Sequence, residues 1–360
     1  MDTRAPENHA LFAGFSLFLV LSLISCTTES PRNRPVQQPS PKSEQEVSRA
    51  RIDTHSIHTR AEKLAPMQSL LISRDGEIIM EYYADGVTPD RSVNIKSASK
   101  SVLSALVGIA LEEDHLDSLD QTLIEFFPAI LEDGPPAKQN ITLRDLLLMR
   151  SGLESTSFEN YGPWVTSNNW VRNALERPLV DSPGEETNYS TGNSHILAAV
   201  LTKATGRDLR HYAQERLFDP IDVEIGSWQK SPEGYRFGGN NFSLTPGGFL
   251  RFGQLYEREG RWDDRQIVPS EWVRESTQSH VHDIYHGYPY GYFWWNTNYH
   301  GLDVDFAWGH GGQYVFVVPE LDLVVATTSN LQSTQQDDGY TENVHEFLKN
   351  DILPNPHGQN

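Results

Sequence analysis

The sequence predicts an α+β fold, in which an antiparallel sheet built from both ends of the folded chain is flanked by helices and encloses an inserted, mostly helical domain. Strand-like runs lie near the start of the folded chain, at 69–83, and near its end, at 305–329. Between them the apolar residues recur mainly at helical spacing. Strands at both ends and helices in the middle give this architecture.

The first 26 residues have the pattern of an export signal. An apolar run from Leu11 to Ile24 has about 14 residues, too few to span a bilayer but typical of a signal-peptide core. Cys26, the only cysteine of the chain, follows Leu23–Ser25, which resembles the lipobox of bacterial lipoprotein signal peptides. We therefore expect lipidation at Cys26 and attachment to the periplasmic side of the bacterial cell envelope. A cleaved signal peptide with an incidental cysteine, and hence secretion, is the alternative.

A linker and one folded domain follow. Residues 27–54 are rich in Pro, Ser, Gln and charge, which predicts a flexible tether. The folded domain is expected over 55–350. Its sheet subdomain takes about 55–115 and 287–350, and its helical subdomain takes about 116–286.

The first elements of that domain are a hairpin and an apolar helix. Ser69–Ser73 and Glu77–Tyr83 flank Asp75 and Gly76, a strong hairpin signal. The helix that follows Ser97 is apolar over most of its circumference, which is typical of a buried helix.

Helices are predicted through the middle of the chain, where Thr142, Gly206 and the pair Thr245–Pro246 supply caps. They span Leu116–Phe127, Leu143–Ser151, Trp164–Leu175, His195–Ala204, Asp208–Leu217 and Phe249–Glu259, with a short helix at Ser270. The last section returns to strands at Asp305–Trp308, Gln313–Val318 and Leu323–Ser329, and a helix at Asn343–Leu353 closes the domain.

The charge of the chain argues against nucleic acid as a partner. The formal net charge is −20 and no run of Lys and Arg stands out, so nucleic acid is not an expected partner. No motif implies a cofactor.

Ser97 and Lys100 form the most informative motif, Ser-x-x-Lys. A serine and a lysine three residues apart share one helix face, so the amine can reach the hydroxyl. Burial disfavours the charged form of a lysine and makes it a better base. Ser97 is therefore a candidate nucleophile and Lys100 its activator. A serine cap followed by a surface lysine is the alternative.

Two later segments strengthen this interpretation. Asn188–Asn193 precedes the helix at His195, and Trp308–Gln313 begins a late strand. With all three segments in this order, residues 55–350 resemble the serine β-lactamase and penicillin-binding-protein superfamily, which carries a Ser-x-x-Lys motif. Within it, the chain is most similar to the branch of class C β-lactamases, carboxylesterases and 6-aminohexanoate-dimer hydrolases.

The resemblance implies a role for each matching residue. Ser97 and Lys100 match the nucleophile and its lysine, and Tyr189 matches the tyrosine of a Tyr-x-Asn motif that helps move the serine proton. The backbone N–H groups of Ser97 and Gln313 match the oxyanion hole. Thr191 stands where the family has asparagine, and Asn193 lies two residues later; both are candidate substrate-binding residues.

The third motif of the family is Lys-Thr-Gly, and here it reads His310, Gly311 and Gly312. These three residues are also candidate substrate-binding residues. A mostly neutral histidine holds a β-lactam carboxylate less well than lysine, and Gly311 lacks a hydroxyl donor. The sequence therefore favours a serine hydrolase that cleaves an ester or amide bond in a small-molecule or peptide-like substrate through an acyl-enzyme.

Three other interpretations compete with this one. One is a penicillin-binding, β-lactam-sensing or D-Ala carboxypeptidase-like protein with slow deacylation. Another is a metal hydrolase, suggested by a cluster whose spacing departs from the metallo-β-lactamase signature. An α/β-hydrolase is disfavoured because no Gly-x-Ser-x-Gly motif occurs. The cluster consists of His280, His282, Asp283 and His286, which we expect to be exposed loop residues.

Overall fold

The computed structural model describes residues 52–285, 287–331 and 339–354. The predicted signal peptide, Cys26 and all but the last residues of the predicted linker lie outside these ranges. Within them, no helix is both long enough and apolar enough to cross a bilayer.

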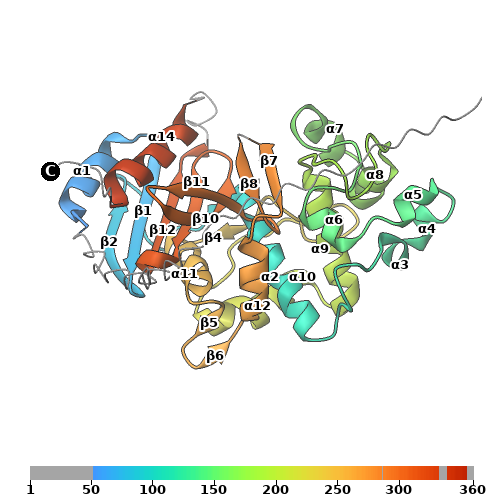
Figure 1. The fold of residues 1–360 in the computed structure, drawn as a ribbon, viewed down its shortest axis with the longest axis horizontal. Helices are drawn as coiled ribbons and strands as arrows, with labels where there is room; N and C mark the ends of the chain where they lie inside the picture. Colours follow the sequence, from blue (N-terminus) through green and yellow to red (C-terminus); the bar gives the residue numbers. More distant parts are fainter. Residues whose placement is uncertain (1–51, 286, 332–338, 355–360) are drawn as a thin grey trace, which may run out of the picture. The chain divides into compact units, whose positions relative to one another are not determined.

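The centre of the folded domain is one eight-stranded sheet, in the order β2-β1-β12-β11-β10-β9-β8-β7, whose neighbouring strands all pair antiparallel. The first and last strands of the chain meet inside it, because Leu70 of β1 pairs with Thr327 of β12. Figure 1 shows these early blue strands beside the late red ones. The predicted fold class is therefore confirmed. The strands are β1 (Met67–Arg74), β2 (Glu77–Tyr83), β7 (Val281–Tyr285), β8 (Tyr288–Tyr290), β9 (Trp295–Tyr299), β10 (Leu302–Gly309), β11 (Gln313–Val318) and β12 (Leu323–Ser329).

Helices cover both faces of the sheet. Gly253 of α11 (Pro246–Glu257) lies against Val315. His345 of α14 (Tyr340–Phe347) packs its ring against the neighbouring Phe316. Because successive residues of a strand point to opposite faces, α11 and α14 lie on opposite sides of β11. This explains why every residue of β11 and β12 is buried.

The helical part is built around two buried helices, α2 (Ser99–Glu112) and α9 (Thr191–Thr205), which contact each other. α2 is apolar over most of its surface, as expected for an enclosed helix, whereas α9 also buries the polar residues Thr191, Asn193, Ser194 and His195. The other α-helices are α1 (Thr54–Lys63), α3 (Leu123–Phe126), α4 (Pro128–Leu131), α5 (Pro136–Gln139), α6 (Leu143–Leu147), α7 (Tyr161–Val165), α8 (Trp170–Glu176), α10 (Leu209–Ala213) and α12 (Ser270–Thr277).

Local capping corrects two predicted helices. The helix expected over 116–127 is confined to Leu123–Phe126, because Thr122 and Glu125 form a capping box that starts it there. The helix expected over 164–175 is two helices, because the side chain of Asn169 accepts a hydrogen bond from the backbone N–H of Arg172 and begins α8 anew.

A small sheet aligns the segment that enters the site. β3 (Val93–Asn94) pairs with β4 (Ser243–Leu244), and the Asn94 side chain donates a hydrogen bond to Asn241 (2.8 Å). A further two-stranded sheet, β5 (Arg261–Trp262) with β6 (Arg265–Gln266), lies after α11.

Candidate active site

Ser97 lies in a short 3-10 turn, η1 (Lys96–Ala98), directly before α2. The sequence placed Ser97 at the start of the helix itself; the structure places it in the turn, and Lys100 in the first turn of α2. Lys100 is 2% exposed, and its Nζ donates a hydrogen bond to Ser97 Oγ at 3.1 Å. The expected amine-to-hydroxyl contact is present.

Lys100 has two further neighbours. Its Nζ donates to the carbonyl oxygen of Gly239 at 3.2 Å. It also lies 5.1 Å from the centre of the Tyr189 ring, a cation–π distance. The structure thus brings together Ser97, Lys100 and Tyr189, although Tyr189 is 89 residues later in the chain than Lys100 (189 − 100).

Tyr189 directly precedes the Ser190 cap of α9, and a serine-rich loop fixes it there. The Ser155 hydroxyl donates to the Tyr189 carbonyl oxygen at 2.7 Å. The next two hydroxyls accept the first N–H groups of α9: Ser157 Oγ from Thr191 (2.9 Å) and Thr156 Oγ1 from Gly192 (2.7 Å). These contacts satisfy N–H groups that no helix can satisfy internally. Sequence reasoning missed this loop, because its hydroxyl groups cap a helix that begins 34 residues later in the chain.

Thr191 and Asn193 take part in this packing. Thr191 is 6% exposed, and its hydroxyl forms a hydrogen bond of 3.0 Å with Ser157 Oγ. Asn193 is 1% exposed, and its Oδ1 accepts a hydrogen bond from Ser151 Oγ at 3.0 Å. Neither hydrogen bond leads to Ser97 or Lys100. Substrate binding by Thr191 and Asn193 stays a prediction.

The third predicted segment forms the turn between β10 and β11. His310 is exposed, and Gly311 and Gly312 have φ of +81° and +85°. Such angles favour glycine, so the turn itself accounts for both residues. Gln313 begins β11 opposite Gly309.

Close backbone contact joins this turn to the Ser97 turn. A Cβ at Gly309 would lie 2.0 Å from the carbonyl oxygen of Ile95, so only glycine lets these two backbone segments approach this closely. The turn containing Ser97 contacts both β10 and β11. The backbone of Ser97 and the start of β11 therefore belong to one neighbourhood.

The pKa of the His310 side chain is shifted by its surroundings. Although His310 is exposed at the surface, the protein atoms around its ring partly desolvate it, and this desolvation together with the positive charge of nearby Lys96 lowers the pKa of His310. Since an ordinary histidine is already mostly neutral at pH 7, His310 is neutral there. Burial also lowers the pKa of Lys96, the residue before Ser97. Sequence reasoning had not singled out Lys96 as a neighbour of this site.

Aromatic side chains flank Tyr189. Its ring lies 6.2 Å from that of Trp295 and 6.3 Å from that of Phe158, which is 58% exposed. Trp295 in turn packs edge-on against the buried Tyr290 at 4.6 Å. Trp295 thus connects the Tyr189 ring to the aromatic residues of the core.

The histidine cluster lies only partly in a loop. His280 directly precedes β7, stacks on Tyr292 at 4.5 Å and contacts the carbonyl oxygen of Glu275 at 2.8 Å, whereas His282 is an exposed residue of β7 itself. The side chains of Asp283 and His286 lie outside the described residues. Among the side chains that the structure does describe, no three of His, Cys, Asp or Glu are grouped so that they could hold a metal ion.

Comparison with known proteins decides the family. The family model described as Beta-lactamase matches residues 59–348, most of the chain. The chain belongs to the Beta-lactamase family. It is also similar to 6-aminohexanoate-dimer hydrolase of Paenarthrobacter ureafaciens, with 22% identity over 349 residues, which covers 91% of this chain and 86% of that protein. The family resemblance drawn from the motifs is therefore confirmed.

Other relatives of this Beta-lactamase-family chain are more partial. D-aminopeptidase of Brucella canis is 29% identical over 174 residues, but these cover 44% of this chain and 32% of that protein. Two solved structures share the fold. A penicillin-binding protein homologue from Pyrococcus abyssi has a TM-score of 0.64 and 20% identity over 78% of this chain and 74% of its own. A D-stereospecific amidohydrolase from Streptomyces has a TM-score of 0.63 and 15% identity over 79% and 98%.

Proposed function

We propose that this chain is a serine hydrolase that cleaves an ester or amide bond through an acyl-enzyme on Ser97. The observation that carries the proposal is the contact of 3.1 Å between Lys100 Nζ and Ser97 Oγ, with the Tyr189 ring 5.1 Å from the same amine. A weak nucleophile needs a base within hydrogen-bond reach, and a third group that orients the base.

Proton transfer follows from these contacts. Lys100 accepts the Ser97 proton as Oγ attacks the substrate carbonyl, and Tyr189 shares this role. The same two groups return the proton to the leaving alcohol or amine. Water then attacks the acyl group and releases Ser97. Two N–H groups, of Ser97 and Gln313, are proposed to stabilise the oxyanion, because backbone donors held by a turn and a strand are already oriented when charge develops.

The substrate proposed is a small linear ester or amide. A neutral His310 supplies no fixed cation for a β-lactam carboxylate, and the aromatic rings beside Tyr189 favour an apolar group. The names of the relatives, 6-aminohexanoate-dimer hydrolase and D-aminopeptidase, support amide substrates. Lipidation at Cys26 and residence at the cell envelope remain part of the proposal.

The test is a panel of p-nitrophenyl esters, short linear amides and nitrocefin. We expect ester or amide turnover that disappears in Ser97→Ala and falls by several orders of magnitude in Lys100→Ala, because the base is lost. Ser101→Ala is the matched control, since Ser101 lies on the same helix and donates to the Phe293 carbonyl oxygen (2.7 Å) away from Lys100. It should keep its activity.

Two results would decide against the proposal. If Ser97→Ala hydrolyses activated esters like the wild type, Ser97 is not the nucleophile. If the panel gives no turnover while a labelled penicillin remains covalently bound to Ser97, as seen by intact-protein mass spectrometry, the chain is a penicillin-binding or sensing protein.

A further inference from the structure

A fully buried histidine lies next to the site and has no role in the proposed mechanism. His195, on α9, is 0% exposed. Its ring packs against the rings of Trp164, Trp170 and Phe237, with centroid distances of 5.8, 5.4 and 5.9 Å. Its Nε2 lies 3.4 Å from Oε1 of Glu233. A polar ring enclosed by aromatic residues needs partners for both nitrogens.

Those partners fix the tautomer of His195. The backbone N–H of Gly238 donates to Nδ1 at 3.3 Å, so Nδ1 must carry a lone pair. The proton is therefore on Nε2, which faces the Glu233 carboxylate. Burial lowers the pKa of His195, in agreement with a neutral ring. Burial would raise the pKa of Glu233, but the hydrogen bonds from His195 and from the Val171 N–H lower it to about 2.

The Gly238 backbone, which His195 binds, directly precedes the residue that binds Lys100. The hydroxyl of Ser194, the residue before His195, lies 2.8 Å from the Gly238 carbonyl oxygen and 2.9 Å from the Thr191 carbonyl oxygen, and its one hydrogen is shared between these two acceptors. Gly238 is thus bound on both its N–H and its carbonyl by consecutive residues of α9. The next carbonyl, of Gly239, accepts the hydrogen bond from Lys100 Nζ at 3.2 Å. A shift of Gly238 therefore moves the acceptor of the catalytic amine.

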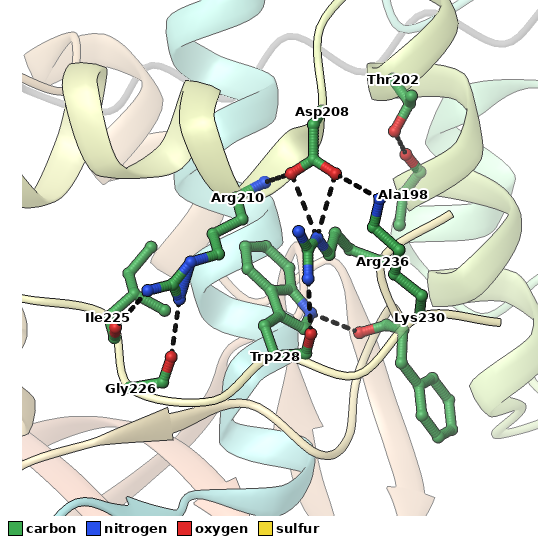
Figure 2. Close-up of polar contacts among 10 residues, drawn as sticks. Ala198, Thr202, Asp208, Arg210, Ile225, Gly226, Trp228, Lys230 and Arg236 are labelled. Atoms are coloured by element: carbon green, nitrogen blue, oxygen red, sulfur yellow. Dashed lines mark hydrogen bonds and ion pairs between the residues drawn. The ribbon is translucent and has the colours of Figure 1, made fainter. Parts of the chain in front are cut away.

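The preceding part of this loop is anchored without His195 (Figure 2). Asp208 accepts hydrogen bonds from Arg236 Nε on both carboxylate oxygens (3.1 and 3.2 Å). It also forms an ion pair with Lys230 (2.9 Å). Arg236 Nη1 donates to the Trp228 carbonyl oxygen (2.7 Å), and Trp228 Nε1 donates to the Phe237 carbonyl oxygen (3.0 Å). The loop is therefore fixed up to Phe237, and a change at His195 acts on the two glycines that follow.

We propose that His195 is a positioning residue for Lys100. Its Nδ1 holds the Gly238 N–H, and the adjoining Gly239 carbonyl then keeps the amine in line with the Ser97 hydroxyl. Glu233 holds the other nitrogen and so keeps the ring in the required tautomer. This inference rests on the proposed function, because it needs Lys100 to act on Ser97.

Two amide substitutions separate the two ring nitrogens. In His195→Asn the side-chain oxygen lies near the position of Nδ1 and can accept from the Gly238 N–H, but the contact with Glu233 is lost. In His195→Gln the amide N–H₂ lies near the position of Nε2 and can donate to Glu233, but the acceptor for Gly238 is lost. Gln is close to histidine in length and Asn is one methylene shorter, so loss of packing alone predicts the larger effect in His195→Asn.

We expect kcat for ester hydrolysis to fall about tenfold or more in His195→Gln and to stay within about threefold of wild type in His195→Asn, since small misplacements of a catalytic group have large rate effects. KM should change little in either variant. Thr202→Val is the control, because Thr202 lies further along α9 and bonds only the Ala198 carbonyl oxygen (2.9 Å). Its kcat should equal that of wild type. Assays are run below the thermal midpoint of every variant.

A kcat loss in His195→Asn equal to or larger than that in His195→Gln would overturn the proposal, since loss of packing alone predicts the larger effect in the smaller residue. Wild-type kcat in His195→Gln would overturn it as well. Neither outcome would affect the proposed function, which fails only if Ser97→Ala remains active or if Ser97 retains a penicillin.

Discussion

The glycine that receives the Lys100 amine gives the sharpest prediction about catalysis. Gly239 has φ of +98°, and a Cβ built there would lie 2.7 Å from Lys100 Nζ and 2.6 Å from Ser194 Oγ. Gly239→Ala therefore inserts a methyl group between the Lys100 amine and the Ser194 hydroxyl. Lys100 is buried, so its amine cannot move without disturbing its contact with Ser97.

The size of the effect follows from the distances. Non-bonded contacts between carbon and nitrogen are comfortable at about 3.5 Å, so the amine must retreat by roughly 0.8 Å. A misplacement of about 1 Å can cost 10²-fold in rate, so kcat should fall about 100-fold with KM nearly unchanged. The positive φ adds roughly 1–2 kcal/mol of destabilisation in the folded state.

The assay compares Gly239→Ala with Gly234→Ala. Gly234 lies in the same loop with φ of +100°, but a Cβ there would meet nothing within 4 Å. Both variants carry the backbone strain, and only one carries the collision. Steady-state ester hydrolysis and the free energy of unfolding are measured on both.

We expect a stability loss in both variants, larger in Gly239→Ala because the added methyl overpacks a buried site, and a large kcat loss in Gly239→Ala alone. If kcat falls equally in both, loop strain accounts for the loss and the collision with Lys100 is refuted. If Gly239→Ala keeps wild-type kcat, the amine does not need the position seen in the structure.

Two predictions concern stability and pH. Burial raises the pKa of Asp305 to about 7, so between about pH 4 and pH 7 the native state keeps a proton that the unfolded state releases; the resulting loss of stability grows with pH and is complete above about pH 7. Asp305→Asn, which still accepts from Asn296, should raise the free energy of unfolding by roughly 2 kcal/mol more at pH 8.5 than at pH 5.5 in urea titrations. An equal gain at both pH values would contradict this. Burial would raise the pKa of Asp208, but its bonds to Lys230 and Arg236 lower it to about 2. The native state then binds fewer protons than the unfolded state, so this contribution is present above about pH 4 and is lost towards about pH 2. The loss should be smaller in Asp208→Asn, and an unchanged acid midpoint would argue against the role of that carboxylate.

Much of the fold was predictable because its signals are local. The hairpin at Asp75–Gly76 and the apolar helix after Ser97 depend on turn chemistry and hydrophobic periodicity, which neighbouring residues alone specify. Helix boundaries were less accurate. The capping box of Thr122 and the cap at Asn169 shorten or divide helices whose apolar pattern is continuous.

The Ser-x-x-Lys spacing by itself determined that an amine and a hydroxyl meet, since both lie within one helical turn. Only the tertiary structure decided what surrounds them. Asn193 matches a motif only loosely and turns into the packing against Ser151, whereas Gly239 matches nothing singled out in the sequence and binds Lys100. The physical reason is that local spacing fixes distances over a few residues, but contacts across 139 residues arise when α2, α9 and the loop before β4 pack together.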